Sequence, residues 1–541
     1  MKRILFALLA VALSLGAAGG KGPATAPASR PATAPATRPA TAPAEGAPEE
    51  LTHGHAPTPP RKELLRRARQ SLRLHRKTIE LAKAGKYEQC IPLLEELLRI
   101  DPTDSMAWYN MACVHSRMGK PEKALAALDK ALEHGYSDFR YMQRDPDFDP
   151  IRALPGYAAV LKRNEQVQRR RAEKLTESLR KRFGEGYIVE VDHPDKLVFA
   201  TDIDRRTLEE LKDHLTAYAK AQWKSLFTHR FEQYVTIVVP AKWPPSRRRL
   251  GGYYLHSQRM LMAKQIGMVM THEFTHALHD ADQDGLGQRH PIWVTEGLAT
   301  LFETSTVTPV KVRPEPNRRL NLLKRLIARG RTIPFKDIVK LSHAEFMKKT
   351  VVGYAQVRYM MMYMYAGGRL KQWYDAYTAG FEKDKTGAKA LEKVYGMKLS
   401  KIEAKWKRWV RKQKSPPVRL RRNSAYIGVQ TRSLRDGLKI VTVVPGSGAE
   451  KAGLASGDVI VSVDGQRMVD SAELLKVVSS AKVGQKLRVG YRRDGEYYTA
   501  EVTLGRWTGR RPPRPRPKTR PKPRPRTAPT RPASRPAKKA A

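Results

Sequence analysis

Residues 272–279 have the sequence HEFTHALH, inside a segment with helical periodicity that runs from about residue 265 to 279. Side chains four positions apart lie on one face of a helix, so the imidazoles of His272 and His276 can reach one metal ion. Zn²⁺ suits this pair, because neutral imidazole nitrogens are among its usual ligands. Glu273 follows the first histidine directly, where its carboxylate can exchange protons with a water beside the metal.

A catalytic zinc ion needs three protein ligands and one open position. Glu296, twenty residues after His276, is the candidate for the third ligand. The gap fits a first helix, a loop over residues 280–290 and a second helix that begins at Pro291. Two histidines that only pack in a core are the alternative, and the presence of Glu273 and Glu296 favours the metal site.

The sequence HEFTHALH followed by PIWVTEGLATLFE at residues 291–303 resembles the gluzincins, the peptidase-MA-like family related to thermolysin. The resemblance covers roughly residues 185–410, and we predict an α+β zincin-like metallopeptidase domain over residues 185–415. It implies hydrolysis of peptide bonds with one catalytic Zn²⁺. It also implies a set of site residues: the zinc ligands His272, His276 and Glu296, with Glu273 as the general base.

Other residues near this site carry weaker predictions. Tyr354 resembles the tyrosine of the family's downstream helix, where it would be a catalytic hydrogen-bond donor to the oxyanion; the alternative is a tyrosine that only packs. Residues 251–262 suggest an edge strand for an extended substrate, or an ordinary strand. His279 and His290 are assigned no role.

A helical domain is predicted over residues 62–182. Its GKYE at residues 85–88 recurs as GKPE at residues 119–122, a period of 34 residues. This period resembles the tetratricopeptide repeat, a helix–turn–helix unit known as TPR. Two such units do not bury a stable core, so residues 136–182 should supply capping helices.

A β-rich domain is predicted over residues 424–506, where short strands alternate with glycine turns such as GDVIVSVDG at residues 457–465. This region resembles the PDZ domains of HtrA-type bacterial proteases. The resemblance implies that a C-terminal peptide adds as a strand, with its carboxylate on backbone amides of one loop. The residues of that loop are Tyr426, Ile427, Gly428 and Val429. A PDZ domain that only packs on its neighbour is the alternative.

The two ends of the chain have biased compositions. Residues 1–18 combine a basic start, an apolar run and small residues, which predicts a signal peptide and an exported protein in the periplasm, cell envelope or medium. An uncleaved signal anchor is the alternative. Residues 19–61 form a linker rich in Pro, Ala and Thr, and residues 507–541 a basic Pro-rich tail, and both are predicted to be disordered.

The chain carries 101 Lys and Arg against 53 Asp and Glu, a net charge of +48. This excess attracts polyanions, and the basic tail is expected to contact them without specificity. No RNP motif, helix-turn-helix signature or cysteine-ligated finger accompanies the charge, so no specific nucleic acid is expected. Only two cysteines occur, Cys90 and Cys113, and both are predicted to be core residues rather than a disulfide framework.

These features together predict an exported zinc peptidase. Its PDZ and TPR-like modules would recruit protein or peptide substrates and partners. A non-catalytic envelope scaffold with a degenerate zincin domain is the alternative. The intact Glu273 favours the enzyme, because a site without turnover does not need the base.

Overall fold

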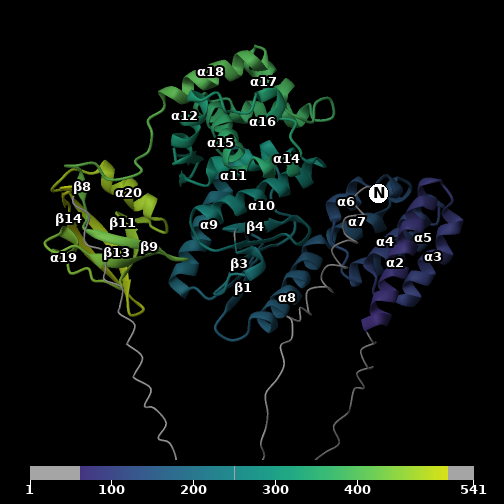
Figure 1. The fold of residues 1–541 in the computed structure, drawn as a ribbon. Coiled ribbons are helices and arrows are strands. Elements are labelled where there is room, and N and C mark those ends of the chain that lie inside the picture. The colour runs from purple at the N-terminus through teal and green to yellow at the C-terminus, as the bar shows by residue number, and fades with distance from the viewer. Residues whose placement is uncertain (1–60, 249, 510–541) are drawn as a thin grey trace, which may run out of the picture. The chain divides into compact units, whose positions relative to one another are not determined.

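The computed structural model describes residues 61–248 and 250–509, shown as ribbons in Figure 1. The predicted signal peptide, nearly all of the Pro-rich linker and the tail from residue 510 onward lie outside the described residues. None of the helices in the described ranges is both long enough and apolar enough to span a membrane.

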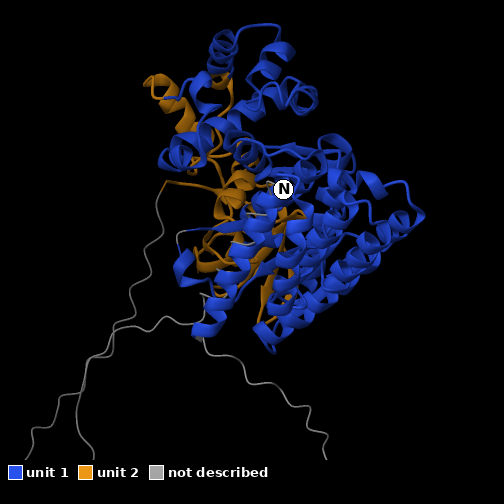
Figure 2. Cartoon of the chain, turned by 90° about the vertical axis from the view of Figure 1, so that its right-hand side faces the viewer, with its two compact units in different colours: residues 1–264, 269–315, 332–409 blue, residues 265–268, 316–331, 410–541 orange. Residues whose placement is uncertain are grey.

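The chain divides into two compact units, coloured separately in Figure 2. The first unit holds the predicted helical domain and most of the predicted catalytic domain. The second unit holds the C-terminal β-rich region and two short segments from the middle of the chain. In residue numbers, the first unit is 1–264, 269–315 and 332–409, and the second is 265–268, 316–331 and 410–541.

The first unit begins with a run of helices. They are α2 (Arg61–Lys83), α3 (Tyr87–Ile100), α4 (Ser105–Arg117), α5 (Pro121–Glu133), α6 (Phe139–Arg144), the 3-10 helix η1 (Pro146–Ile151), α7 (Pro155–Lys162) and α8 (Asn164–Phe183). The 34-residue period corresponds to the pairs α2–α3 and α4–α5. Gly85 and Gly119 follow the first helix of each pair with φ of 72° and 67°, a left-handed conformation that favours glycine. The recurring glycine therefore marks the same turn twice.

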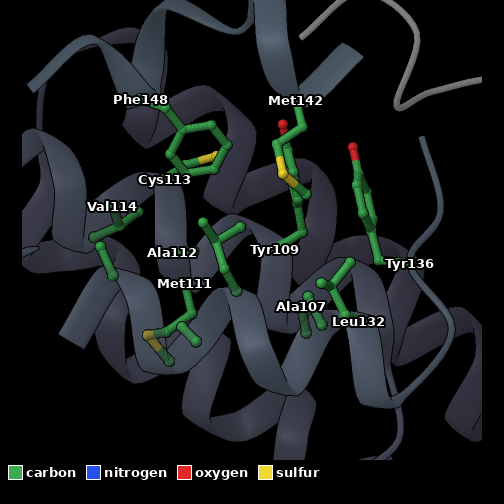
Figure 3. Close-up of a cluster of buried hydrophobic side chains, with 14 of the residues drawn as sticks. Ala107, Tyr109, Met111, Ala112, Cys113, Val114, Leu132, Tyr136, Met142 and Phe148 are labelled. Carbon is green, nitrogen blue, oxygen red and sulfur yellow. The ribbon is translucent and has the colours of Figure 1, made fainter. Parts of the chain in front are cut away.

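The core of this helical region is one cluster of buried side chains from Leu74 to Val167, part of which Figure 3 shows. It extends well beyond the second repeat, as the prediction of capping helices requires. Tyr109 stacks on Tyr136 with ring centroids 4.1 Å apart. Both cysteines are buried and free, which agrees with their prediction as core residues.

A five-stranded sheet follows, in the order β1-β2-β3-β5-β4. Its strands are β1 (Ile188–Asp192), β2 (Leu197–Thr201), β3 (Val235–Val239), β4 (Gly252–Leu255) and β5 (Met260–Ala263). The central strands β2 and β3 are buried along their whole length, which suits their apolar and β-branched sequences LVFAT and VTIVV. Helix α9 (Arg205–Ser225) lies between them in the chain, and β2 and β3 pair in parallel.

The segment 251–262, predicted as one edge strand, forms two strands. Only β4 lies at the edge of the sheet, and it pairs antiparallel with β5, which lies inside. The 3-10 helix η3 (His256–Gln258) makes the turn, and Arg259 closes it with φ of 45°. The sequence shows no glycine or proline at this turn, which is why it was not predicted.

Helix α10 (Met268–Leu286) carries the HEFTH sequence and contradicts the predicted loop over residues 280–290. Aspartates are poor helix formers, but residues from elsewhere in the fold donate hydrogen bonds to an aspartate carboxylate near the end of this helix. Asp282 accepts a hydrogen bond from Thr228 N at 2.9 Å and another from the Tyr374 hydroxyl at 2.7 Å. These partners from distant parts of the chain allow the helix to continue through the aspartates.

The rest of the first unit consists of further helices and a short hairpin. Helix α11 (Ile292–Phe302) begins directly after Pro291, as predicted. The remaining elements are β6 (Ser305–Val307), β7 (Val312–Pro314), α13 (Phe335–Ile338), α14 (His343–Lys348), α15 (Thr350–Ala366), α16 (Leu370–Ala379), α17 (Ala388–Tyr395) and α18 (Leu399–Lys412), with the 3-10 helix η2 (Pro245–Arg247) before β4.

The C-terminal region of the second unit is an antiparallel sheet in the order β14-β13-β11-β10-β9, with β12 paired to β11. Its elements are β8 (Ala425–Tyr426), β9 (Val429–Ser433), β10 (Leu438–Val443), α19 (Gly448–Lys451), β11 (Val459–Val463), β12 (Gln466–Arg467), α20 (Ser471–Ser480), β13 (Lys486–Arg493), β14 (Glu496–Thr503) and β15 (Gly505–Arg506); α12 (Arg319–Ala328) is the helix of the unit's middle segment. Strands β14 and β9 are the two edge strands of this sheet.

Candidate metal centre

Three side chains converge from α10 and α11. His272 and His276 lie one helical turn apart on α10, and their Nε2 atoms are 3.2 Å from each other. Glu296 Oε2, from α11, lies 3.4 Å from the first nitrogen and 3.6 Å from the second. The ligands of a tetrahedral zinc ion lie about 3.3–3.5 Å from one another, given bonds of 2.0–2.2 Å. The structure therefore brings the three predicted ligands together at a spacing that one ion would bridge.

The surroundings of these three atoms fit a cation. Glu296 Oε2 is buried and faces the two imidazoles. Burial lowers the pKa of His272, but hydrogen bonds to Glu296 and Glu303 outweigh this and raise it to about 10. Burial raises the pKa of Glu296, and the charges of His276 and His272 pull it far below its usual range. The site therefore stabilises positive charge, which a divalent ion would supply in place of a proton.

Glu273 lies against the backbone of the edge strand β4. Its side chain is buried, and burial raises its pKa. A Cβ added to Gly252 would lie 2.8 Å from Glu273 Cγ and 2.7 Å from Val269 Cγ1. Only glycine allows the strand to pass this close to the acid. The sequence interpretation included this glycine in a strand but missed its contact with Glu273.

Tyr354 lies beside the site on α15. Its ring centroid is 6.4 Å from that of His272, and its ring packs edge-on against Phe346 at 5.4 Å. Gly353 makes this packing possible, because a Cβ there would lie 2.9 Å from the Phe346 ring. Tyr354 therefore lies close to His272, and its role as a hydrogen-bond donor stays a prediction.

His279 and His290, which received no role, form a buried pair outside the ligand group. His279 Nε2 lies 2.8 Å from His290 Nδ1, and the His279 ring stacks on Phe227. The backbone of His290 donates a hydrogen bond to Gln283 Oε1 at 2.7 Å. Burial lowers the pKa of both imidazoles, that of His290 to about 3. The pair is therefore held neutral inside the fold.

Two charged residues near the ligands were missed by the sequence interpretation. Glu303 Oε2 lies 3.4 Å from His272 Nδ1, and Arg358 Nη1 lies 3.7 Å from Glu303 Oε1. Glu303 could have been predicted from the sequence, because it follows Glu296 by seven residues, which is two helical turns along one face. Arg358 gives no such signal, because it comes from a helix 55 residues further along the chain.

A second group of potential ligands lies in the helical region, formed by Cys113, Asp145 and Asp147. Asp145 already has partners: one oxygen accepts a hydrogen bond from the Tyr109 hydroxyl at 2.9 Å and the other from Asp147 N at 3.1 Å. These bonds begin η1 and tie it to α4. The close approach of these three side chains is therefore explained by the packing of the helices.

The predicted carboxylate-binding loop of the β-rich region joins β8 to the edge strand β9. Gly428 has φ of 97°, and a Cβ there would lie 2.1 Å from Ser447 Cβ. The carbonyls of Ile427 and Gly428 accept hydrogen bonds from Ala449 N at 3.0 Å and Val444 N at 2.8 Å. These contacts fix the loop beside the free edge of the sheet.

Comparisons with known proteins match parts of the chain. The PDZ domain family matches residues 425–504, and the Tetratricopeptide repeat family matches residues 81–145. These matches confirm both predicted modules, and neither reaches residues 146–424.

Curated relatives are similar over one short stretch each. A chloroplastic protein of Arabidopsis thaliana is 36% identical over 90 residues, which is 16% of this chain and 27% of the relative. "Probable periplasmic serine endoprotease DegP-like" of Marinomonas sp. (strain MWYL1) is 44% identical over 69 residues, 13% of this chain and 15% of the relative. A solved HtrA3 PDZ domain bound to a phage-derived ligand is 26% identical, covering 15% of this chain and 94% of that chain, with a TM-score of 0.14. The chain thus spans only 27% and 15% of the length of these two curated relatives.

The neutral histidine pair predicts how stability depends on pH. The unfolded chain binds protons to both imidazoles below their usual pKa of 6.5, whereas the folded chain does so only at lower pH. Their contribution to stability is therefore complete above pH 6.5 and is lost as the pH falls toward 3. Each histidine should lower the free energy of unfolding by about 1.4 kcal/mol per pH unit in that window.

Urea unfolding at pH 7, 6 and 5 measures this slope. We expect His290→Gln to make the dependence on pH shallower than in the parent protein. His343→Gln, at an exposed position of α14, is the matched control and should leave the slope unchanged. Equal slopes for His290→Gln and the parent would show that the buried pair does not resist protonation.

Proposed function

We propose that residues 185–415 form a zincin-like domain that hydrolyses peptide bonds with one zinc ion held by His272, His276 and Glu296. The observation that carries this proposal is the convergence of two imidazole nitrogens and a carboxylate oxygen within 3.6 Å, next to the buried acid Glu273. The similarity to named serine endoproteases covers one module, so the proposed reaction type rests on this site.

Each group at the site would have a separate role in the reaction. Zn²⁺ at this position would supply a Lewis acid and lower the pKa of a water. Glu273, whose raised pKa brings it closer to neutral pH, would accept a proton and deliver it to the leaving amine. Tyr354 would donate a hydrogen bond to the carbonyl oxygen as charge develops there. The free edge of β4 would hold an extended substrate by strand pairing.

The modules on either side of this domain would bring substrates or partners to it. An edge strand beside a loop fixed at Ile427 and Gly428 is the arrangement that accepts a C-terminal peptide by strand addition. We place the protein in the periplasm, cell envelope or medium, because its N-terminal composition agrees with the word "periplasmic" in the name of a relative. Contact of the basic tail with polyanions stays a prediction.

Replacing the general base tests the enzyme against a scaffold. Glu273→Gln keeps the volume of the side chain but removes the proton acceptor, so we expect peptidase activity to fall by about 10²–10⁴-fold. The variant should still hold one zinc ion per chain. Activity is measured on a panel of unfolded protein substrates and zinc by elemental analysis.

Glu382→Gln is the matched control, since that side chain is 82% exposed and pairs with Lys385. It should behave as the parent protein does. If Glu273→Gln folds, holds zinc and cleaves the panel as fast as the parent, the enzyme proposal is wrong and the scaffold is favoured.

The close approach of β4 gives a second test. Gly252→Ala places a methyl group against Glu273 and Val269, so the acid must move by a fraction of an ångström or more. Misplacement of a reacting group by about 1 Å can cost 10²-fold in rate, so we expect a loss of kcat of roughly 10- to 100-fold with zinc content unchanged.

The matched control is Gly251→Ala, whose added Cβ would come no closer than 3.2 Å to Val269 Cγ2 and meets no atom of Glu273. It should reduce kcat far less. Equal kcat for Gly252→Ala and Gly251→Ala would contradict the idea that this glycine sets the position of the base.

A further inference from the structure

Arg358 is one of the largest fully buried side chains of the protein, with 0% of its surface exposed. It lies in the middle of α15, in a stretch rich in methionine and tyrosine. Burying a guanidinium is costly unless each side of it is paired. Its neighbours should therefore show why this helix carries a charge at this position.

The Arg358 guanidinium faces the C-terminal end of α11. Its Nη1 donates a hydrogen bond to Leu301 O at 3.0 Å, and its Nη2 donates one to Glu315 O. Nη1 also lies 3.7 Å from Glu303 Oε1, and the Glu303 side chain is only 3% exposed. The arginine thus holds the backbone on both sides of β6 and β7 and places its charge next to one buried carboxylate.

The other oxygen of that carboxylate faces a predicted metal ligand. Glu303 Oε2 lies 3.4 Å from His272 Nδ1, while His272 Nε2 faces His276 and Glu296 on the opposite side of the ring. Both nitrogens of this imidazole are therefore engaged: Nε2 with the candidate metal centre and Nδ1 with Glu303. The contacts form a continuous chain from Arg358 through Glu303 to His272.

We propose that Glu303 and Arg358 are positioning residues for the metal ligand His272, an inference that rests on the proposed zinc site. A carboxylate on Nδ1 keeps the proton on that nitrogen, so the lone pair of Nε2 points at the metal. The arginine holds the Glu303 carboxylate in place at the end of α11. Arg358 therefore acts on the metal only through Glu303.

A purely structural role makes a different prediction. If the buried pair only joins α15 to α11, its loss lowers stability and leaves the affinity of the folded protein for Zn²⁺ unchanged. If the pair positions His272, zinc affinity falls in variants that still fold. The affinity of the metal alone therefore separates the two roles without any assay of activity.

The experiment is a competition between a chromophoric chelator and the full-length protein for Zn²⁺, with circular dichroism to verify folding. We expect Glu303→Gln, which keeps the side-chain volume, to bind Zn²⁺ about 10- to 100-fold more weakly than the parent. Arg358→Met should show a similar loss. The double variant should bind no more than about threefold more weakly than Glu303→Gln, because both changes act through one carboxylate.

Glu190→Gln is the matched control. Glu190 forms a partly buried ion pair with Lys212 at 3.1 Å and is itself 24% exposed. Its replacement removes a comparable pair from the same compact unit, so it should lower stability and leave zinc affinity as it is in the parent.

The outcomes are distinguishable. A parent protein that binds no Zn²⁺ overturns the proposed function itself. A parent that binds Zn²⁺ while a folded Glu303→Gln binds it within about twofold of the parent overturns the positioning role, whether or not Arg358→Met folds. If the losses of Zn²⁺ affinity multiply in the double variant, Arg358 acts on the site by a route other than Glu303.

Discussion

The site depends on the convergence of two imidazoles and one carboxylate from two different helices. His272 and His276 are fixed relative to each other by one turn of α10. Glu296 reaches them only because the packing of α11 brings its side chain next to this turn. Neighbouring elements support this arrangement. Strand β4 approaches Glu273 at Gly252. Helix α15 places Tyr354 near His272 and Arg358 near Glu303. A site of this kind requires the whole domain to fold before any one residue can act.

The helical region also helps to hold the ligand helix α10 in place within the first unit. Arg140 and Arg144, both on α6, donate hydrogen bonds to the carbonyls of Ala281 at 3.0 Å and Gly285 at 2.9 Å. These carbonyls lie at the C-terminal end of α10, where cations stabilise a helix. The repeat-like helices therefore do more than offer a surface for partners, because they secure the far end of the ligand helix. The second unit has its own core and its own sheet, and a PDZ domain is defined there by the matched residues.

The sequence predicted most accurately the features that depend on local spacing. Histidines four residues apart, the recurring Gly85 and Gly119, and the β-branched runs of β2 and β3 each carry their structure in a short stretch, and all were placed correctly. Features that depend on distant partners were missed. The continuation of α10 past Asp282 needs Thr228 and Tyr374, and the burial of Arg358 needs Glu303, so neither follows from a local pattern. The contact of Gly252 with Glu273 was missed for the same reason.

The most direct test of the account is the zinc K-edge X-ray absorption spectrum of the purified full-length protein. We expect one zinc ion per chain with two imidazole nitrogens and at least one oxygen at about 2.0–2.2 Å, and no sulfur ligand. A protein that carries no zinc, or a spectrum dominated by a sulfur ligand at about 2.3 Å, would contradict the claim that these two helices hold the metal.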